Sequence, residues 1–301
     1  MIVIFEKVFT LFAFAAAGYA LAKLGLVNKD HSKALSVLLV YVFMPCNVLK
    51  TYAANFNPTY IAEKWPIIVV SSIVVVIIAL LSHGAARWFS KDNYERKVYA
   101  YILAIANIGY MGFPIAEHLM GSSGLMNAMM CALPMYTLYI YTIGFCNLTK
   151  RKVSLRNLVN PAFVPIVIGA ILGLSQLPLP DVAWSIFKTG SACMGPVSMM
   201  MAGIVVSGFK LKPLLLNRKA YIVTALRLVI IPILLGVCLM WIPDKDIVKT
   251  IVLLYAMPCG MNTIVFPKLV GENCEIGAGQ ALISNIAAVA TIPVVLSLFG
   301  I

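Results

Sequence analysis

The stretch Asn107–Pro114, NIGYMGFP, lies in the middle of an apolar run from Val98 to Met120. It places an amide, two glycines and a proline near the depth at which a bilayer offers the backbone no water. A helix interrupted there leaves N–H and C=O groups unpaired at a cost of several kcal/mol each, so the interruption is tolerable only beside protein, a water-filled cavity or a ligand. We therefore expect a broken transmembrane helix here.

A second stretch of the same kind is Pro258–Pro267, PCGMNTIVFP, midway along the run Ile247–Val270. Gly260 follows Gly109 by 151 positions, about half of the 301-residue chain. Paired interrupted helices indicate the binding site of a transporter. The alternative is a pair of ordinary proline kinks.

The composition is that of a polytopic membrane protein. Hydrophobic residues make up 61% and charged residues 11% of the chain, with a mean hydropathy of +0.95. Soluble domains carry about a quarter charged residues. The formal charge of +12 does not indicate a nucleic-acid partner, because the basic residues fall mostly in short loops between apolar runs.

Several other classes of function are disfavoured. The seven cysteines show no C-x-x-C spacing, so neither a zinc site nor a disulfide framework is expected. The sequence has no G-x-x-x-x-G-K, H-E-x-x-H or G-x-S-x-G motif. We expect neither an enzyme nor a protein with a bound metal or organic cofactor.

A span needs about 20 mainly apolar residues, and that length divides the chain into ten candidate spans in an all-α fold. Glycines, prolines and aspartates recur between the halves at an offset of 151, as in Gly18 with Gly169 and Pro45 with Pro196. Five helices per copy is an odd number, so the second copy enters the membrane from the opposite side, which makes the repeats inverted. The candidate spans are 5–24, 34–54, 65–89, 98–120, 124–148, 160–177, 182–208, 219–241, 247–270 and 275–300.

Loop charge predicts the orientation. Sixteen basic residues lie in loops of one side, whereas Lys7, Lys50, Lys64, Lys245 and Lys249 lie on the other. The positive-inside rule makes the first side cytoplasmic, so both termini face outward.

The predicted ligand is an anion. The second half of each broken helix starts near the membrane centre, and a helix N-terminus carries roughly half a positive charge. Asn107 and Asn262 each offer two donors and an acceptor, Thr263 assists, and Pro114 suits the first turn of its half-helix. The backbone of the two interruptions adds Gly109, Pro258 and Gly260 to the predicted substrate-binding residues.

Two cations lie inside spans. Lys188 is a candidate partner of a substrate carboxylate, or else a lysine that extends to the outer interface. Arg227 is expected to be structural and to extend toward the basic loop that holds Arg218. Glu117 and His118 follow the first interruption close to the outer surface, and they are candidates for a proton or gating role or else interfacial residues.

One face of the last span is polar. Gln280, Ser284 and Asn285 fall at i, i+4 and i+5, so we include them in the predicted site as residues that line the cavity opposite the interruptions. The alternative is that they bond helices to one another. The polar residues of the fifth span spread around the helix and are interpreted mainly as packing and interface anchors; they are Tyr136, Thr137, Tyr139, Tyr141 and Thr142.

With these two interruptions and the segment Gly18–Pro45, GYALAKLGLVNKDHSKALSVLLVYVFMP, the chain resembles the auxin efflux carrier family and looks like a bacterial member of it. The resemblance implies a secondary carrier of organic anions, such as malate, malonate or auxin-like acids, in the inner membrane. It also implies a scaffold at 1–60 and 157–214, often dimeric, and a mobile transport domain at 61–156 and 215–301 that moves like an elevator.

The coupling ion stays open. No Asp or Glu lies deep within a span, so a buried carboxylate relay has little support, and sodium, a proton or no ion at all remain. A sodium-coupled symporter resembling the bile acid carriers is one alternative, and a membrane sensor that binds ligand without moving it is another.

Overall fold

The computed structural model describes residues 2–150, 163–208, 216–268 and 270–301. Throughout these ranges the secondary structure is helical, apart from one isolated pair of bridged residues. The predicted domain boundaries after residues 156 and 214, and the start of the predicted span 160–177, lie outside the described residues.

The helices are those of a multi-pass membrane protein, as predicted. Among the residues that the structure describes, six helical stretches are long and apolar enough to cross a bilayer, and two shorter apolar helices, Phe9–Lys23 and Val164–Ser175, accompany them. The six are Ala34–Asn55, Pro66–Phe89, Ile108–Thr149, Asp181–Ser207, Arg218–Leu239 and Glu275–Leu298.

The elements follow one another closely, and several spans contain a π-helical segment (η). The first half of the chain comprises α1 (Ile2–Lys23), α2 (Lys29–Leu38), η1 (Leu39–Phe43), α3 (Met44–Asn55), α4 (Pro58–Lys64), α5 (Pro66–Phe89), α6 (Asn93–Ala104), η2 (Ile108–Gly112), α7 (Phe113–Pro134), η3 (Met135–Gly144) and α8 (Phe145–Thr149). The second half comprises α9 (Phe163–Ser175), α10 (Asp181–Ser207), α12 (Arg218–Ala225), η5 (Leu226–Ile230), α13 (Ile231–Leu239), α14 (Lys245–Tyr255), α15 (Asn262–Lys268) and α16 (Glu275–Leu298).

Short polar side chains mark the starts of four of these helices. Asn57, Asp92, Asn217 and Asp244 each accept a hydrogen bond from a backbone N–H of the first turn that follows. Such caps satisfy donors that the helix leaves open at its N-terminus. The loops between spans therefore carry the sequence signals that start the helices.

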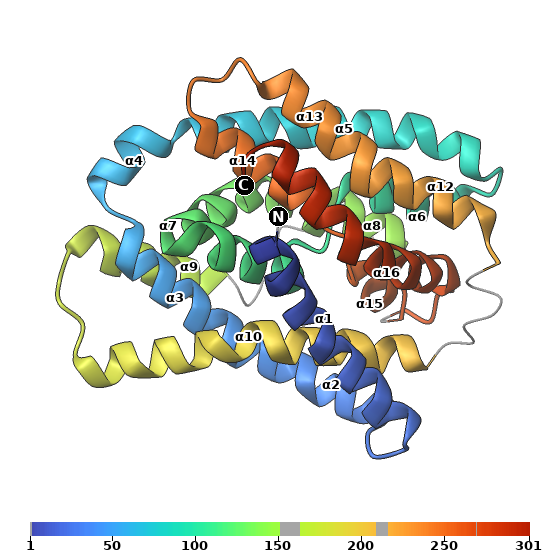
Figure 1. Ribbon diagram of the computed structural model, residues 1–301, viewed down its shortest axis with the longest axis horizontal. Coiled ribbons are helices and arrows are strands. Elements are labelled where there is room, and N and C mark those ends of the chain that lie inside the picture. The colour runs from blue at the N-terminus through green and yellow to red at the C-terminus, as the bar shows by residue number, and fades with distance from the viewer. Residues whose placement is uncertain (1, 151–162, 209–215, 269) are drawn as a thin grey trace.

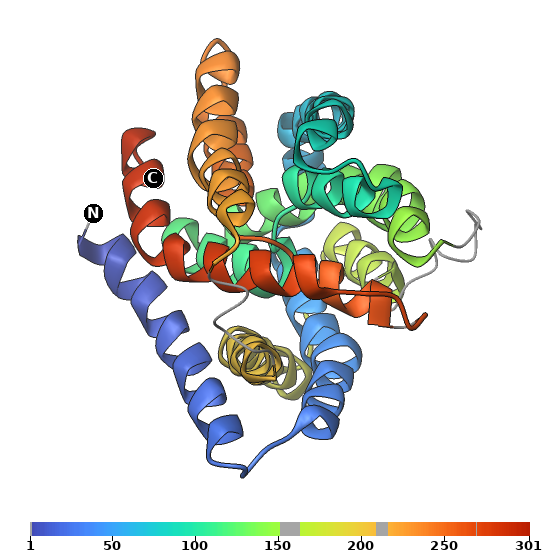
Figure 2. The ribbon, with the colours of Figure 1, turned by 90° about the vertical axis from the view of Figure 1, so that its right-hand side faces the viewer.

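The helices form two groups with the interrupted segments between them. Helices α1, α2, α3 and α10 gather on one side of the molecule, and α5, α12 and α13 lie on the other (Figure 1). The view from the side shows the same separation, with the blue and yellow helices below and the teal and orange ones above (Figure 2). Helix α16 contacts both groups, through α1 and α10 and through α12.

Glycines let helices of the first group approach closely. A Cβ atom on Gly203 of α10 would lie 1.9 Å from the carbonyl oxygen of Ala15 on α1, and a Cβ on Gly18 would lie 2.1 Å from that of Met200. Helix α9 packs on α3 in the same way, with Gly169 against Tyr52. Small residues at such contacts are typical of helix packing in membranes.

Both predicted interruptions are present, and they meet. Helix α6 ends at Ala104 and α14 ends at Tyr255. The backbone N–H of Asn107 donates to the carbonyl oxygen of Pro258 at 2.8 Å, and Ala106 forms an antiparallel bridge with Cys259. The backbone of each interruption thus satisfies part of the other.

The first interruption lies earlier than the sequence indicated. The non-helical residues are 105–107, so Gly109 and Pro114 belong to the helix that resumes after them. The resumed helix begins at once because the carbonyl oxygen of Asn107 accepts from the N–H groups of Met111 and Gly112. The expectation that Pro114 occupies the first helical turn is therefore wrong by about one turn.

Proline at position 114 leaves one carbonyl group without its usual helical donor, since its ring has no N–H for the residue four positions back. That residue is Tyr110, and the hydroxyl of Ser198 on α10 donates to its carbonyl oxygen at 2.8 Å. A serine of the neighbouring helix thus supplies the missing bond, as occurs at prolines in membrane helices.

The segments after the two interruptions end alike. Gly121 has φ 72° and Gly271 has φ 74°, a left-handed conformation that favours glycine. These two glycines, which lie 150 positions apart in the sequence, therefore share a positive φ.

Ion pairs join the loops of the two halves. Lys64 bonds Asp244 and Asp246 at 2.7 and 3.1 Å, and Lys150 pairs with Glu272 at 2.7 Å. Burial disfavours the charged form of Lys64, but its hydrogen bonds to the two carboxylates outweigh this effect and raise its pKa. Lys64 therefore remains a cation at neutral pH.

We predict that Gly260→Ala separates the two interruptions. A Cβ there would lie 3.1 Å from the carbonyl oxygen of Ala106, which is backbone and has little room to move. Overpacking of this kind costs about 1–3 kcal/mol, so the thermal midpoint of the purified protein should fall by several degrees.

Gly84→Ala in α5 is the matched control. A Cβ on Gly84 meets nothing within 4 Å. Alanine inside a helix is favoured over glycine by roughly 0.5–1 kcal/mol of folding free energy, so this change should leave the thermal midpoint equal or raise it. Equal midpoints for the two variants would contradict a tight contact at Gly260.

Candidate functional site

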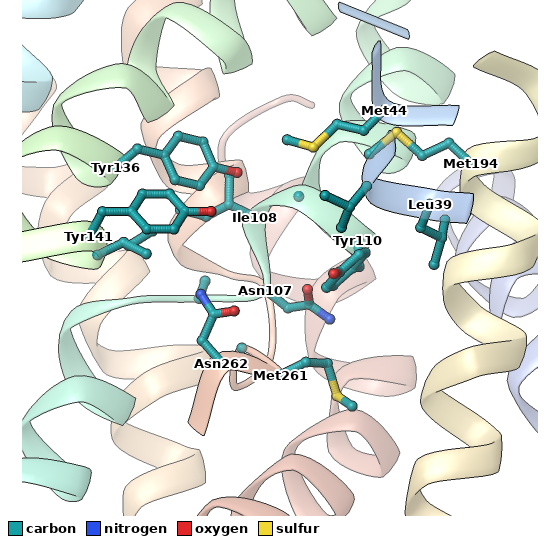
Figure 3. A pocket seen from close by; sticks show the side chains of 15 residues that line it. Leu39, Met44, Asn107, Ile108, Tyr110, Tyr136, Tyr141, Met194, Met261 and Asn262 are labelled. Carbon is teal, nitrogen blue, oxygen red and sulfur yellow. The ribbon is translucent and has the colours of Figure 1, made fainter. Parts of the chain in front are cut away.

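A cavity of about 80 Å³, which we call the central cavity, lies where the two interruptions meet. It brings together four of the predicted site residues, Asn107 and Gly109 from the first interrupted helix and Gly260 and Asn262 from the second. Figure 3 shows both amide side chains at this cavity. Its other lining includes Leu39, Met44, Tyr110, Tyr136, Tyr141, Met194 and Met261.

The two amides are held from opposite halves of the chain. Asn262 begins α15, and its Nδ2 donates to the phenol oxygen of Tyr101 on α6 at 2.9 Å. Asn107 is 3% exposed and is fixed through its own backbone, which bonds Pro258, Met111 and Gly112. Each amide thus has a defined position at the cavity.

Two tyrosines that the sequence analysis assigned to packing also line this cavity. Tyr136 and Tyr141 stack with ring centres 5.9 Å apart. Residues five apart lie about 140° around an α-helix, but η3 is a π-helix, whose i→i+5 bonds bring them onto one face. Because the prediction assumed α-helical spacing, it spread these side chains around the helix. Composition and α-helical spacing do not reveal a π-helix.

Three predicted site residues support the interruptions from behind the cavity. The carbonyl of Pro258 accepts from Asn107, and the hydroxyl of Ser284 accepts from the N–H of Cys259 at 3.0 Å. Thr263 is fully buried and donates to the carbonyl of Gly260 at 2.9 Å. None of the three is among the lining residues.

Gln280 and Asn285 lie away from this cavity. Nε2 of Gln280 bonds Thr224 at 2.7 Å and so joins α16 to α12, which is the alternative role of bonding one helix to another. Asn285 bonds the carbonyl of Ala281 and lines an apolar groove between α1, α10 and α16. The three residues meet different neighbours around α16, so they do not line one cavity together.

Lys188 and Pro114 line a second cavity of about 290 Å³, together with Lys50, Glu117 and His118. We call it the outer cavity, after the orientation that loop charge predicts. Lys50 forms an ion pair with Glu117, and the ammonium of Lys188 lies 5.6 Å from the ring centre of Trp184. This polar cavity contains the charged side chains that the central cavity lacks among its lining residues.

Met194 of α10 borders both cavities, because it belongs to the lining of each. The Nδ2 of Asn47 on α3 lies 3.0 Å from its sulfur. The unbranched side chain of methionine adapts to irregular space, so this contact forms a deformable partition.

The predicted extension of Arg227 toward the basic loop is wrong. Its side chain does not extend toward the loop of Arg218 but is 0% exposed, with the guanidinium carbon 5.4 Å from the ring centre of Tyr255. Snorkelling was inferred from distance along the helix alone. Tyr255 comes from α14 and offers a packing surface that only the tertiary structure reveals.

The central cavity offers amide and phenol groups, which can bond a carboxylate without a formal counter-charge in its lining. Its volume suits a ligand of few heavy atoms. Within the part of the chain that the structure describes, no cluster of three or more His, Cys, Asp or Glu side chains could hold a metal ion.

These features define a multi-pass membrane protein with interrupted helices around a small polar cavity. The family model described as membrane transport protein matches residues 3–152 and again residues 145–296. The chain therefore belongs to this family, the auxin efflux carrier family. It is also similar to the uncharacterized transporter MJ1031 of Methanocaldococcus jannaschii, at 26% identity over 118 residues. That match spans 38% of each of the two chains.

We predict that Ser284→Ala destabilises the second interruption. Loss of the hydroxyl leaves the buried N–H of Cys259 without its acceptor, at a cost of about 1–3 kcal/mol. Ser297→Ala is the control on the same helix, since that hydroxyl bonds only within α16, to the carbonyl of Val294. Chemical denaturation should show the loss for Ser284 alone, and equal losses would contradict this role.

Proposed function

We propose that this protein carries small organic anions across a membrane and binds them in the central cavity. The observation that carries this proposal is the meeting of the two interruptions beside a cavity lined by Asn107 and Asn262. Irregular backbone at membrane depth requires such a setting, and secondary transporters place substrate at the ends of their interrupted helices.

The ligand of this cavity is an anion, most simply a carboxylate. The resumed helix that begins at Ile108 directs its N-terminal end toward the cavity, and such an end favours negative charge. Amide and phenol donors complement carboxylate oxygens. Malate, malonate and auxin-like acids are the candidates that the family resemblance supplies.

The architecture of the proposed carrier is ten spans in two inverted five-helix repeats. Three observations support the repeat: the family model matches the chain twice, Gly121 and Gly271 share a positive φ, and the close packing of α1 on α10 has a counterpart in α9 on α3. In this proposal the segments 61–156 and 215–301 move against the scaffold as an elevator, with dimers forming through the scaffold.

The outer cavity is the proposed approach to the central one. Lys188 draws the anion toward it, and Met194 yields to let the anion pass.

The test begins with a thermal-shift screen of small carboxylates on the purified protein, followed by flux of the best ligand into liposomes. Binding together with accumulation or release supports a carrier. Binding without flux would assign the protein to the class of ligand-binding sensors, and a screen without any stabilising carboxylate would refute the proposal.

We predict that Asn107→Ala and Asn262→Ala each weaken binding of the best carboxylate by about tenfold or more, because a hydrogen bond to a charged group contributes roughly 1.5–3 kcal/mol. Titration calorimetry measures this loss. Asn147→Ala, a partly buried amide that contacts His83 instead, serves as the control and should bind normally. Unchanged affinity in both cavity variants would remove the amides from the site.

We predict that Lys188→Gln slows uptake of dianions more than uptake of monoanions, since attraction to a cation in the outer cavity scales with ligand charge. Initial rates for a dicarboxylate and a monocarboxylate in liposomes give the comparison. Lys249→Gln, whose ammonium bonds the carbonyl of Gly300, is the control. Equal losses for both ligands would limit Lys188 to the interface.

A further inference from the structure

Arg227 is a buried cation with none of its donors bonded. It lies in η5, within the apolar helix Arg218–Leu239, and is 0% exposed. Nε, Nη1 and Nη2 have no hydrogen-bond partner among the described residues. Charged residues inside a membrane are rare, costly and usually functional.

No carboxylate of the described chain compensates this charge. The acidic groups that form ion pairs within the described ranges are bonded to lysines in other places. These pairs are Glu117 with Lys50, Asp244 and Asp246 with Lys64, and Glu272 with Lys150. The compensation for Arg227 must therefore come from something other than an acidic side chain of this set.

The end of α14 lies beside this charge. The guanidinium carbon of Arg227 lies 5.4 Å from the ring centre of Tyr255, the last residue of α14. A helix C-terminus carries roughly half a negative charge. The last carbonyl groups of α14 keep much of their partial negative charge, because those of Leu253 and Leu254 accept only long hydrogen bonds, of 3.2 and 3.4 Å, from backbone N–H groups.

The position of Arg227 is fixed from the other side. One turn earlier on the same span, Thr224 bonds Gln280 of α16 at 2.7 Å. Arg227 thus lies between the ring of Tyr255 on α14 and helix α16, which η5 contacts.

In transporters with interrupted helices, N-terminal ends face the anion, and C-terminal ends coordinate the coupling cation. We propose that Arg227 is a tethered cation that takes the place of a diffusible one at the end of α14, so that the anion site is complete without sodium. This inference rests on the proposed function and specifies how that site is charged. A neutral residue at this position leaves a vacancy that sodium can fill.

The experiment compares wild type, Arg227→Met and Arg227→Lys in sodium chloride and in choline chloride. Arg218→Met, a change at an exposed arginine at the start of the same span, is the matched control. We expect wild type, Arg218→Met and Arg227→Lys to bind the best carboxylate equally in both salts, within about threefold. Arg227→Met should bind at least about tenfold more weakly in choline and recover in sodium.

A ligand-free measurement tests the same proposal independently of substrate. Sodium should raise the thermal midpoint of Arg227→Met by several degrees relative to choline and leave that of wild type unchanged. Wild-type affinity or stability that rises strongly with sodium would overturn the proposal, as would full binding by Arg227→Met in choline.

The two proposals fail in different ways. A wild-type protein that binds carboxylate only with sodium refutes the tethered cation and leaves the carrier intact. A wild-type protein that binds no carboxylate refutes the carrier, and the ligand-free midpoints then decide the role of Arg227. Should Arg227→Met not fold, the sodium response of wild type and of Arg227→Lys gives the decision.

Discussion

The need to satisfy backbone groups away from water governs this structure. Two helices stop within apolar runs, and the non-helical backbone of each interruption bonds to that of the other. The contacts are the hydrogen bond from Asn107 to Pro258 and the bridge between Ala106 and Cys259. The hydroxyl of Ser284 supplies one further acceptor. Because these bonds join segments about half the chain apart, the two halves must fold against each other before either interruption is stable.

This constraint explains residues whose roles would otherwise look unrelated. Gly260 is needed because the carbonyl of Ala106 lies where a Cβ would project, and Ser198 replaces the donor that Pro114 removes. Such replacements allow the helix to resume at once on the far side of the gap. The central cavity is the space left beside the two interruptions, where their side chains do not fill the gap between the helices.

The interruptions could be predicted because glycine, proline and asparagine within apolar runs are a local signal, and so could the amides beside them. The roles of other residues depended on partners far along the chain. Gln280, Ser284 and Asn285 lie within six residues of α16, yet they meet α12, the second interruption and an apolar groove in turn. Arg227 and the stacked pair of tyrosines likewise required knowledge of α14 and of a π-helix, which helical periodicity cannot supply.

The distribution of charge fits a carrier better than a tight receptor. Formal charges lie in the outer cavity and behind the second interruption, whereas the central cavity itself presents amides, phenols and apolar groups. An anion in the central cavity would be held by hydrogen-bond donors and by the electric field of a cation that does not touch it, without a direct ion pair. Conduction requires binding strong enough for entry and weak enough for exit. Removing the cation from direct contact, while keeping its field, achieves that balance in the proposed site.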